Sequence, residues 1–156
     1  MTQWLDDRSM SAWMAYVWLR IRVEGEIAFD LERHGLSAPD YDVLTTLSAQ
    51  RDDSMRARDL AKSLTWHKAR LSRHLARMDK RGLVTRSPAP EDARGIVVAL
   101  SPHGRERLEA AAPDHAALIQ RMFADQLTEA EIDALVSLSS KVVAAADREA
   151  EARTVT

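Results

Sequence analysis

Cationic side chains are concentrated in one part of this 156-residue chain, between residues 54 and 86. This stretch holds ten Lys and Arg residues against two Asp residues, a net charge of +8 in a chain whose net charge is −2. No acidic residue occurs from Thr65 to Met78. A helix face that is merely solvated usually mixes charges of both signs, and self-repulsion of this kind is tolerated mainly where a polyanion relieves it. The pattern therefore predicts contact with nucleic acid.

The residues from 65 to 81 predict one helix with a core side and a basic side. Thr65 is the expected N-cap, and Gly82 follows the last turn, where a residue in the left-handed conformation often ends a helix. With about 100° between successive residues, the apolar positions fall on one side. That side carries Leu71, Leu75 and Met78.

The opposite side of this helix carries the cations. Small side chains there allow close approach to a groove, and Arg can contact guanine or phosphate in bidentate fashion. We place Trp66 on this side and His74 on its flank, and expect His67 and His74 to meet phosphate or the helix edge. The residues of this segment expected to contact DNA are Thr65, His67, Lys68, Ala69, Arg70, Ser72, Arg73 and Arg77.

A β-hairpin with a long tip is expected directly after this helix. Residues 83–87 and 96–100 have the composition of strands, and the Pro- and Gly-containing segment 88–95 separates them. Arg86 lies on the first strand and Arg94 near the tip, and an Arg at such a tip can enter the minor groove of DNA. The alternative is that Arg94 only pairs with Asp92 and staples the turn.

The remaining elements complete a mainly α fold, a winged helix-turn-helix flanked by N- and C-terminal dimerisation helices, in one domain spanning 1–156. We predict the winged region over 37–101, opened by Ser37 as an N-cap, with a short helix over 55–64 before the basic one. The dimerisation helices are expected over 10–34 and 102–149. Pro113 should break or kink the second of these, and a capping box at Thr128 opens the last helix.

Dimerisation is expected because both terminal helices have an apolar surplus. The first contains Trp13, Val17 and Trp18, and the last contains an apolar run at 142–146. A partner subunit would cover this surface. The alternative is that the two helices pack only on each other within one chain.

Residues 59–104 resemble the MarR family of bacterial transcriptional regulators. The resemblance depends on Arg81-Gly-Leu-Val84 at the end of the basic helix, Asp92-Ala-Arg94 in the wing, and Leu100-Ser-Pro-His-Gly104 at the entry to the next helix. It implies a homodimer with interlocking terminal helices and a palindromic operator in double-stranded DNA. It also implies a small ligand bound between the dimer helices and the winged region. By this resemblance the DNA-reading helix maps onto 65–81 and the wing arginine onto Arg94. The segment Thr65 to Ala69 departs from the family pattern, being more basic and aromatic.

A ligand pocket is expected where the first two helices meet the winged region. Aromatic walls and one Arg suit an aromatic or carboxylate ligand, although aromatic residues at helical spacing also suit a dimer core. The residues expected to line this pocket are Trp13, Tyr16, Trp18, Arg22, His34 and Tyr41.

Several function classes are disfavoured by what the sequence does not contain. There is no Cys, which excludes disulfides, thiol catalysis and thiolate metal sites, and the five His residues lack metal-ligand spacing. No catalytic triad, carboxylate pair or phosphate loop stands out, so we expect neither an enzyme nor a cofactor. No signal peptide or membrane span is apparent, which predicts a cytoplasmic protein without membrane contact. We therefore expect a sequence-specific transcriptional regulator, a homodimeric repressor released by a small ligand. The alternative is a winged-helix interaction module without DNA affinity.

Overall fold

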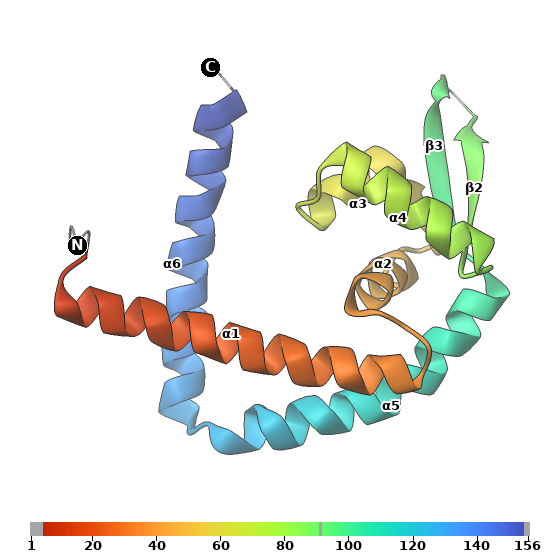
Figure 1. Cartoon of the computed structure of the whole chain (residues 1–156). Helices are drawn as coiled ribbons and strands as arrows, with labels where there is room; N and C mark the ends of the chain where they lie inside the picture. Colours follow the sequence, from red (N-terminus) through yellow and green to blue (C-terminus); the bar gives the residue numbers. More distant parts are fainter. Residues whose placement is uncertain (1–4, 91, 155–156) are drawn as a thin grey trace. The chain divides into compact units, whose positions relative to one another are not determined.

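The computed structural model describes residues 5–90 and 92–154, with the backbone only at 92–94 and at 154. It divides into a first unit that ends at His115 and a second that begins at Ala116. The first unit contains α1 (Asp7–Arg33), α2 (Ala38–Ser48), β1 (Ser54–Arg56), α3 (Ala57–Ser63), α4 (Lys68–Lys80), β2 (Val84–Ala89), β3 (Asp92–Leu100) and the beginning of α5 (Pro102–Met122). The second contains the end of α5, the short 3₁₀ helix η1 (Ala124–Gln126) and α6 (Glu129–Thr154). In Figure 1, α2, α3 and α4 lie beside the hairpin of β2 and β3.

Helix α1 begins three residues earlier than the predicted position 10. Asp6 is its N-cap, and the Asp6 carboxylate accepts a hydrogen bond from the backbone N–H of Ser9 at 2.9 Å. The helix ends at Gly35, which has φ +68°. The N–H of Leu36 then donates to the carbonyl of Leu31 at 3.0 Å, which closes the last turn.

Helix α2 starts as predicted, with Ser37 as its N-cap. The Asp40 N–H donates to Ser37 Oγ at 3.2 Å, and the Ser37 N–H donates to Asp40 Oδ2 at 2.9 Å. This reciprocal pair is a capping box, which satisfies two backbone donors that the first turn of a helix leaves free.

The predicted role of Thr65 as the N-cap of the basic helix is wrong. Thr65 has φ +53°, and its N–H donates to the carbonyl of Lys62 at 3.0 Å while the next N–H, of Trp66, donates to Ala61 at 2.8 Å. These bonds close the end of α3, so Thr65 terminates one helix and does not cap the next. Helix α4 therefore spans Lys68–Lys80, shorter than 65–81, and its N-cap residue His67 makes no side-chain capping bond.

The end of α4 at Gly82 is confirmed. Gly82 has φ +70°, its N–H donates to Asp79 at 2.9 Å, and the N–H of Leu83 donates to Met78 at 3.0 Å. The same closing pattern thus ends α1, α3 and α4, but only α3 places a β-branched residue at the left-handed position.

The hairpin belongs to a three-stranded antiparallel sheet of order β1-β3-β2. The sequence analysis missed β1 and assigned Met55 to a helix, whereas Met55 pairs with Val98 in β3. A three-residue strand has no periodicity of its own, and only pairing with β3 identifies it. Strands β2 and β3 also extend into the predicted tip, so that Pro88 pairs with Ile96.

Pro113 does not break the helix that contains it, whereas the alternative outcome expected there, a kink, remains a prediction. Helix α5 continues from Pro102 to Met122 with Pro113 inside it. Because Pro113 has no N–H, the backbone carbonyl of Glu109 lacks its usual helical donor. Both residues are exposed, so water can solvate that carbonyl.

The predicted capping box of α6 is confirmed, because the N–H and Oγ1 of Thr128 both donate to Glu131.

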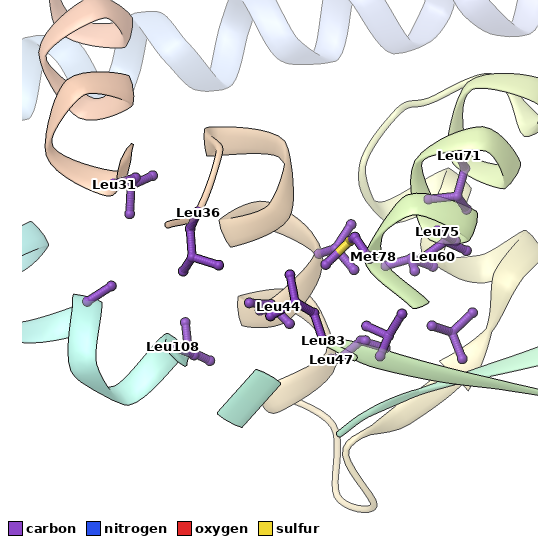
Figure 2. Packing of buried hydrophobic residues seen from close by; sticks show 14 residues of the cluster. Leu31, Leu36, Leu44, Leu47, Leu60, Leu71, Leu75, Met78, Leu83 and Leu108 are labelled. Carbon is purple, nitrogen blue, oxygen red and sulfur yellow. The ribbon is translucent and has the colours of Figure 1, made fainter. Parts of the chain in front are cut away.

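The core of the first unit lies among α2, α3, α4 and the sheet (Figure 2). Its members include the three residues of α4 predicted to face inward, Leu71, Leu75 and Met78, each at most 2% exposed. Burial of each such side chain stabilises the fold by about 1.5–3 kcal/mol. The rotation of α4 about its axis is therefore fixed by this apolar side. Other fully or almost fully buried members are Leu31, Leu36, Leu44, Leu47, Leu60, Leu83 and Leu108.

Gly104 permits a close approach between α5 and the start of β2. A Cβ at this position would lie 2.0 Å from the carbonyl oxygen of Leu83, so only glycine fits.

In the described part of the chain, every helix is too short or too polar to cross a membrane.

The left-handed position of Thr65 generates a prediction about stability. We expect Thr65→Gly to increase the free energy of unfolding by about 1 kcal/mol, because glycine removes the strain of a β-branched residue at positive φ. Gly82→Ala should decrease it by about 1–2 kcal/mol for the converse reason. Both changes are measurable by urea denaturation, and a destabilised Thr65→Gly protein would contradict the assignment of Thr65 to the end of α3.

Candidate nucleic-acid interface

Helix α4 turns its basic side to solvent, because its apolar side is anchored in the core. All eight residues predicted to contact DNA in this segment are exposed. We call their side chains the α4 surface: Thr65, His67, Lys68, Ala69, Arg70, Ser72, Arg73 and Arg77. The segment that carries it, Thr65 to Met78, contains no acidic residue, and Asp42 of α2 is an exposed acid that interacts with the charge of Arg70. A polyanion could approach this surface from solvent.

Two residues placed on the exposed side by sequence reasoning lie inside, and His74 is the clearer case. His74 is only 7% exposed, so the expectation that it meets phosphate is wrong. Trp66 packs against the core and meets the His74 ring edge-on, with ring centroids 5.4 Å apart. Helical periodicity puts His74 at the border of the two sides, and only its neighbour on α2 determines which way the ring turns.

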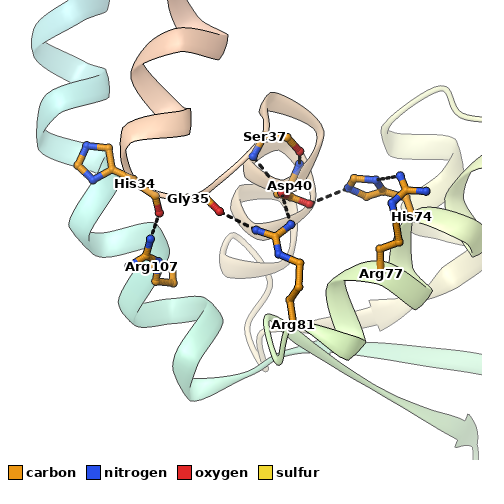
Figure 3. Close-up of polar contacts among 8 residues, drawn as sticks. All are labelled: His34, Gly35, Ser37, Asp40, His74, Arg77, Arg81 and Arg107. Carbon is orange, nitrogen blue, oxygen red and sulfur yellow. Dashed lines mark hydrogen bonds and ion pairs between the residues drawn. The ribbon is translucent and has the colours of Figure 1, made fainter.

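That neighbour is Asp40, a carboxylate buried to 1% exposure at the start of α2. Asp40 accepts hydrogen bonds from the Ser37 N–H at 2.9 Å and from Arg81 Nη1 at 2.8 Å (Figure 3). His74 Nε2 lies 3.0 Å from Asp40 Oδ1, although the N–H direction falls outside hydrogen-bond geometry. Arg81 also donates to the carbonyl of Gly35 at 2.6 Å. The network thus joins the end of α1, the start of α2 and the end of α4.

The partners of Asp40 keep it ionised. Burial by itself raises the pKa of this carboxyl, but the contact with His74, the backbone bond from Ser37 and the Arg81 guanidinium together lower the pKa well below its ordinary value. Asp40 lies in the first turn of the helix that Ser37 is predicted to open. Its role as a buried anion could not be found from the sequence, because its partners are 34 and 41 positions away.

The cations of the α4 surface differ in how they are held. The Arg70 guanidinium stacks over the Trp66 ring, 4.1 Å from its centroid, and Arg77 Nη2 lies 2.9 Å from His74 Nδ1. The side chains of Lys68 and Arg73 have no hydrogen-bond, ion-pair or ring partner among the side chains described, those of 5–90 and 95–153. Two arginines are therefore restrained and two cations are free to adapt.

Of the two wing residues predicted to contact DNA, the structure describes the side chain of Arg86 only. Arg86 is on β2, and its Nε donates to Asp79 Oδ2 on α4 at 3.1 Å, which ties the hairpin to that helix. The backbone of Arg94 lies in β3, but its side chain falls outside the described residues, as does that of Asp92. The predicted groove contact of Arg94 and the alternative pair with Asp92 both remain predictions.

The ligand pocket expected from six residues remains a prediction, and the described structure places those residues as follows. Trp13, Tyr16 and Trp18 are exposed on α1, where the first two rings touch at a centroid distance of 5.6 Å. The other three have partners of their own: Arg22 pairs with Glu26, His34 with Asp114, and the ring of Tyr41 contacts that of His115 at a tilt of 49°.

A different open pocket lies within the first unit, with a volume of about 730 Å³. Its lining combines apolar side chains from α1 and α2, such as Phe29 and Pro39, with His74, Arg77 and Arg81 from α4 and its end. None of the six predicted residues lines it. Within the described ranges, no group of three or more His, Asp or Glu side chains is placed to hold a metal ion.

Apolar side chains are exposed in number on α1 and on α6. Singly exposed apolar residues are ordinary, but rows of large ones along a helix are typical of an interaction surface. On α1 these are Trp13, Met14, Trp18, Leu19, Ile21 and Phe29, and on α6 they are Ile132, Val136, Leu138, Val142 and Val143.

Comparison with known proteins places this architecture in a family. The model of the MarR family matches residues 36–96. AbsC, a MarR family transcriptional regulator from Streptomyces coelicolor, superimposes with a TM-score of 0.87 at 33% identity, covering 95% of this chain and 99% of AbsC. Sco3205, a MarR family regulator of the same organism solved in complex with DNA, gives a TM-score of 0.86 at 28% identity, covering 90% of this chain and 89% of Sco3205.

A curated relative is also similar at the sequence level. YdgJ of Bacillus subtilis, an uncharacterised HTH-type transcriptional regulator, is 30% identical over 111 residues. The alignment covers 69% of this chain and 66% of YdgJ, so the chain spans slightly less than two thirds of that relative.

The buried carboxylate of Asp40 predicts a pH-dependent stability. Because its pKa is lowered on folding, Asp40 stabilises the protein above its unfolded pKa of about 4, and this stabilisation is lost as the pH falls toward the folded value. We expect Asp40→Asn to reduce the free energy of unfolding by about 3 kcal/mol at pH 7, and by progressively less below pH 4. Urea titrations at several pH values measure the difference, and a deficit that does not change with pH would contradict the ionised state of Asp40.

Proposed function

This chain belongs to the MarR family of DNA-binding transcriptional regulators, and from that premise we propose that it is a sequence-specific homodimeric repressor of a palindromic operator. One observation carries the proposal. Helix α4 is anchored by Leu71, Leu75 and Met78 and presents a cationic side without acidic residues of its own outward, which suits insertion into the major groove.

Within this proposal the residues of the α4 surface have different roles. Arg70, Arg73 and Arg77 recur along one side of the helix and can reach base edges or phosphates. Lys68 and His67 lie at the first turn, where phosphate contacts orient a recognition helix. The small side chains of Ala69 and Ser72 let the backbone approach the groove, and Thr65 lies in the turn before it.

The wing adds a second contact in this proposal. Arg86 is held by Asp79 at the base of the hairpin, where it can meet the backbone beside the major groove. Arg94, farther along the hairpin, is proposed to enter the adjacent minor groove.

A homodimer supplies two such surfaces. The exposed apolar rows of α1 and α6 each suit burial against a second copy of the chain. Two-fold symmetry then requires a palindromic site with half-sites about 10 bp apart, centre to centre.

Release by a small aromatic carboxylate is the last part of the proposal. The 730 Å³ pocket offers apolar walls for a ring. Its lining also carries Arg77 and Arg81 and the carboxylates of Glu32 and Asp40. Arg81 is paired with Asp40, so Arg77 is the cation left for a ligand carboxylate, and Arg77 belongs both to this pocket and to the α4 surface. A ligand that attracts Arg77 inward would compete with DNA for the same guanidinium. This pocket, and not the set of six residues expected from the sequence, is therefore the proposed effector site.

The first prediction from this proposal concerns salt and the unpaired Arg73. Duplexes selected from a random library by the wild-type protein should contain an inverted repeat, and binding should weaken steeply with salt. Arg73→Ala should weaken binding without unfolding the protein. It should also flatten the slope of log affinity against log salt by about 2, because each phosphate contact contributes about 0.9 and a dimer loses two.

The control is Lys141→Ala, which removes an exposed cation of α6 outside the α4 surface. It should leave affinity and salt slope at the wild-type values. Failure to select any duplex over random sequence would instead favour an interaction module without DNA affinity.

The second prediction concerns the pocket. Benzoate at 100 times its Kd should stabilise the wild-type protein by about 2.7 kcal/mol and weaken binding to the selected duplex. Arg77→Ala should reduce the benzoate-induced thermal shift, because it removes a cation from the pocket lining. An equal shift in both proteins would place the benzoate elsewhere.

A further inference from the structure

Two of the three arginines along the exposed side of α4 are each held by an aromatic side chain that is not itself exposed. Arg70 lies over the face of Trp66 at 4.1 Å, and Arg77 Nη2 lies 2.9 Å from Nδ1 of His74. Trp66 and His74 touch each other at a centroid distance of 5.4 Å and an interplanar angle of 87°. The two aromatic rings therefore form one unit beneath the two guanidinium groups.

The contact of Arg77 restricts where the proton of His74 can be. A guanidinium group has only donors, so Nδ1 of His74 must be the acceptor and must carry no proton. The ring proton then belongs on Nε2, which lies 3.0 Å from Asp40 Oδ1 as an ion-pair contact outside hydrogen-bond geometry. The ionised Asp40 favours that arrangement, because it attracts a proton on the nitrogen nearest to it.

Charges from both packed helices surround this unit. Asp40 and Asp42 approach from α2, and Arg70, Arg77 and Arg81 belong to α4 and its end. The charge of Arg70 partly offsets the increase in the pKa of Asp42 that burial causes. Of the two acidic groups, Asp40 is buried, whereas Asp42 is exposed, as are the arginines of the α4 surface.

We propose that Trp66 and His74 are positioning residues, which hold Arg70 and Arg77 in the orientation that reads DNA, while Asp40 sets the position of the proton on His74. This inference rests on the proposed function of the α4 surface. It also gives a role to Trp66, the aromatic residue in the segment Thr65 to Ala69, where the sequence departs from its family pattern.

The physical benefit is a smaller entropic cost of binding. A free Arg side chain samples many rotamers and loses that freedom when it contacts a base, whereas a side chain already held loses less. Arg73, which has no such partner within the described part of the chain, keeps its freedom and suits a contact with phosphate. Loss of Trp66 or His74 should therefore reduce the preference for the selected duplex over other DNA more strongly than it reduces DNA affinity in general.

A double-mutant cycle tests the link between His74 and Arg77. His74→Phe keeps an aromatic ring against Trp66 but removes the Nδ1 acceptor. Affinity is measured for the duplex selected by the wild-type protein and for a scrambled duplex of the same composition. We expect His74→Phe to weaken binding to the selected duplex about 5- to 10-fold, with a smaller effect on the scrambled one. In an Arg77→Ala background, the same substitution should have almost no further effect.

Arg73→Ala provides the matched background, because Arg73 lies on the same side of α4 without a contact to His74. There the effect of His74→Phe should keep its full size. A Trp66→Leu and Arg70→Ala cycle should show the same coupling. If His74 has only a structural role, His74→Phe should weaken binding equally in the wild-type, Arg77→Ala and Arg73→Ala backgrounds, and that result would overturn the proposal.

The tautomer of His74 supplies a second measurement on the unmodified protein, which decides the matter if His74→Phe does not fold. Nitrogen-15 NMR of the ring should show the proton on Nε2 and a bare Nδ1. A proton on Nδ1 would exclude the bond to Arg77 and overturn the proposal. If Arg70→Ala and Arg77→Ala leave binding unchanged, positioning of these arginines is refuted as well, whereas absence of any selected duplex refutes the proposed function itself.

Discussion

A buried negative charge, the carboxylate of Asp40, is the constraint on which the arrangement of the winged region depends. An ionised carboxylate inside a protein is costly unless it is paired and hydrogen-bonded, so its partners must be brought to it. They are the N–H of Ser37 on its own helix and the side chains of His74 and Arg81 from α4 and its end. The requirement to satisfy one anion therefore determines where α4 meets α2.

The apolar side of α4 works together with this polar network. Leu71, Leu75 and Met78 fix the rotation of the helix about its axis, and Arg81 fixes its end by bonds to Asp40 and Gly35. A helix held on one side by both kinds of contact can leave its other side fully charged. The free energy lost by self-repulsion among the cations is offset by burial on the opposite side.

Turn geometry determines where these helices end, and it also shows the limits of sequence reasoning. Gly35 and Gly82 are glycines at left-handed positions, and such positions can be expected from the sequence. Thr65 occupies the same position at the end of α3, although a Thr before a basic run has the signature of an N-cap. The strand β1 was missed for a related reason, because three residues acquire a strand conformation only from pairing with a distant segment. The continuous helix through Pro113 likewise depends on exposure, which periodicity does not show.

The sequence by itself determined the order of the main helices, the hairpin, the apolar core of α4 and the concentration of charge on its outer side, because these follow from local periodicity, capping and composition. It also carried the family resemblance. Long-range packing determines that Trp66 packs against the core and His74 is buried, that Asp40 is a paired buried anion, and that the pocket borders Phe29 and Arg77. The physical reason is that helical spacing specifies a direction around one axis. The environment of a side chain at the border between two faces is set by the charge that the neighbouring helix places there.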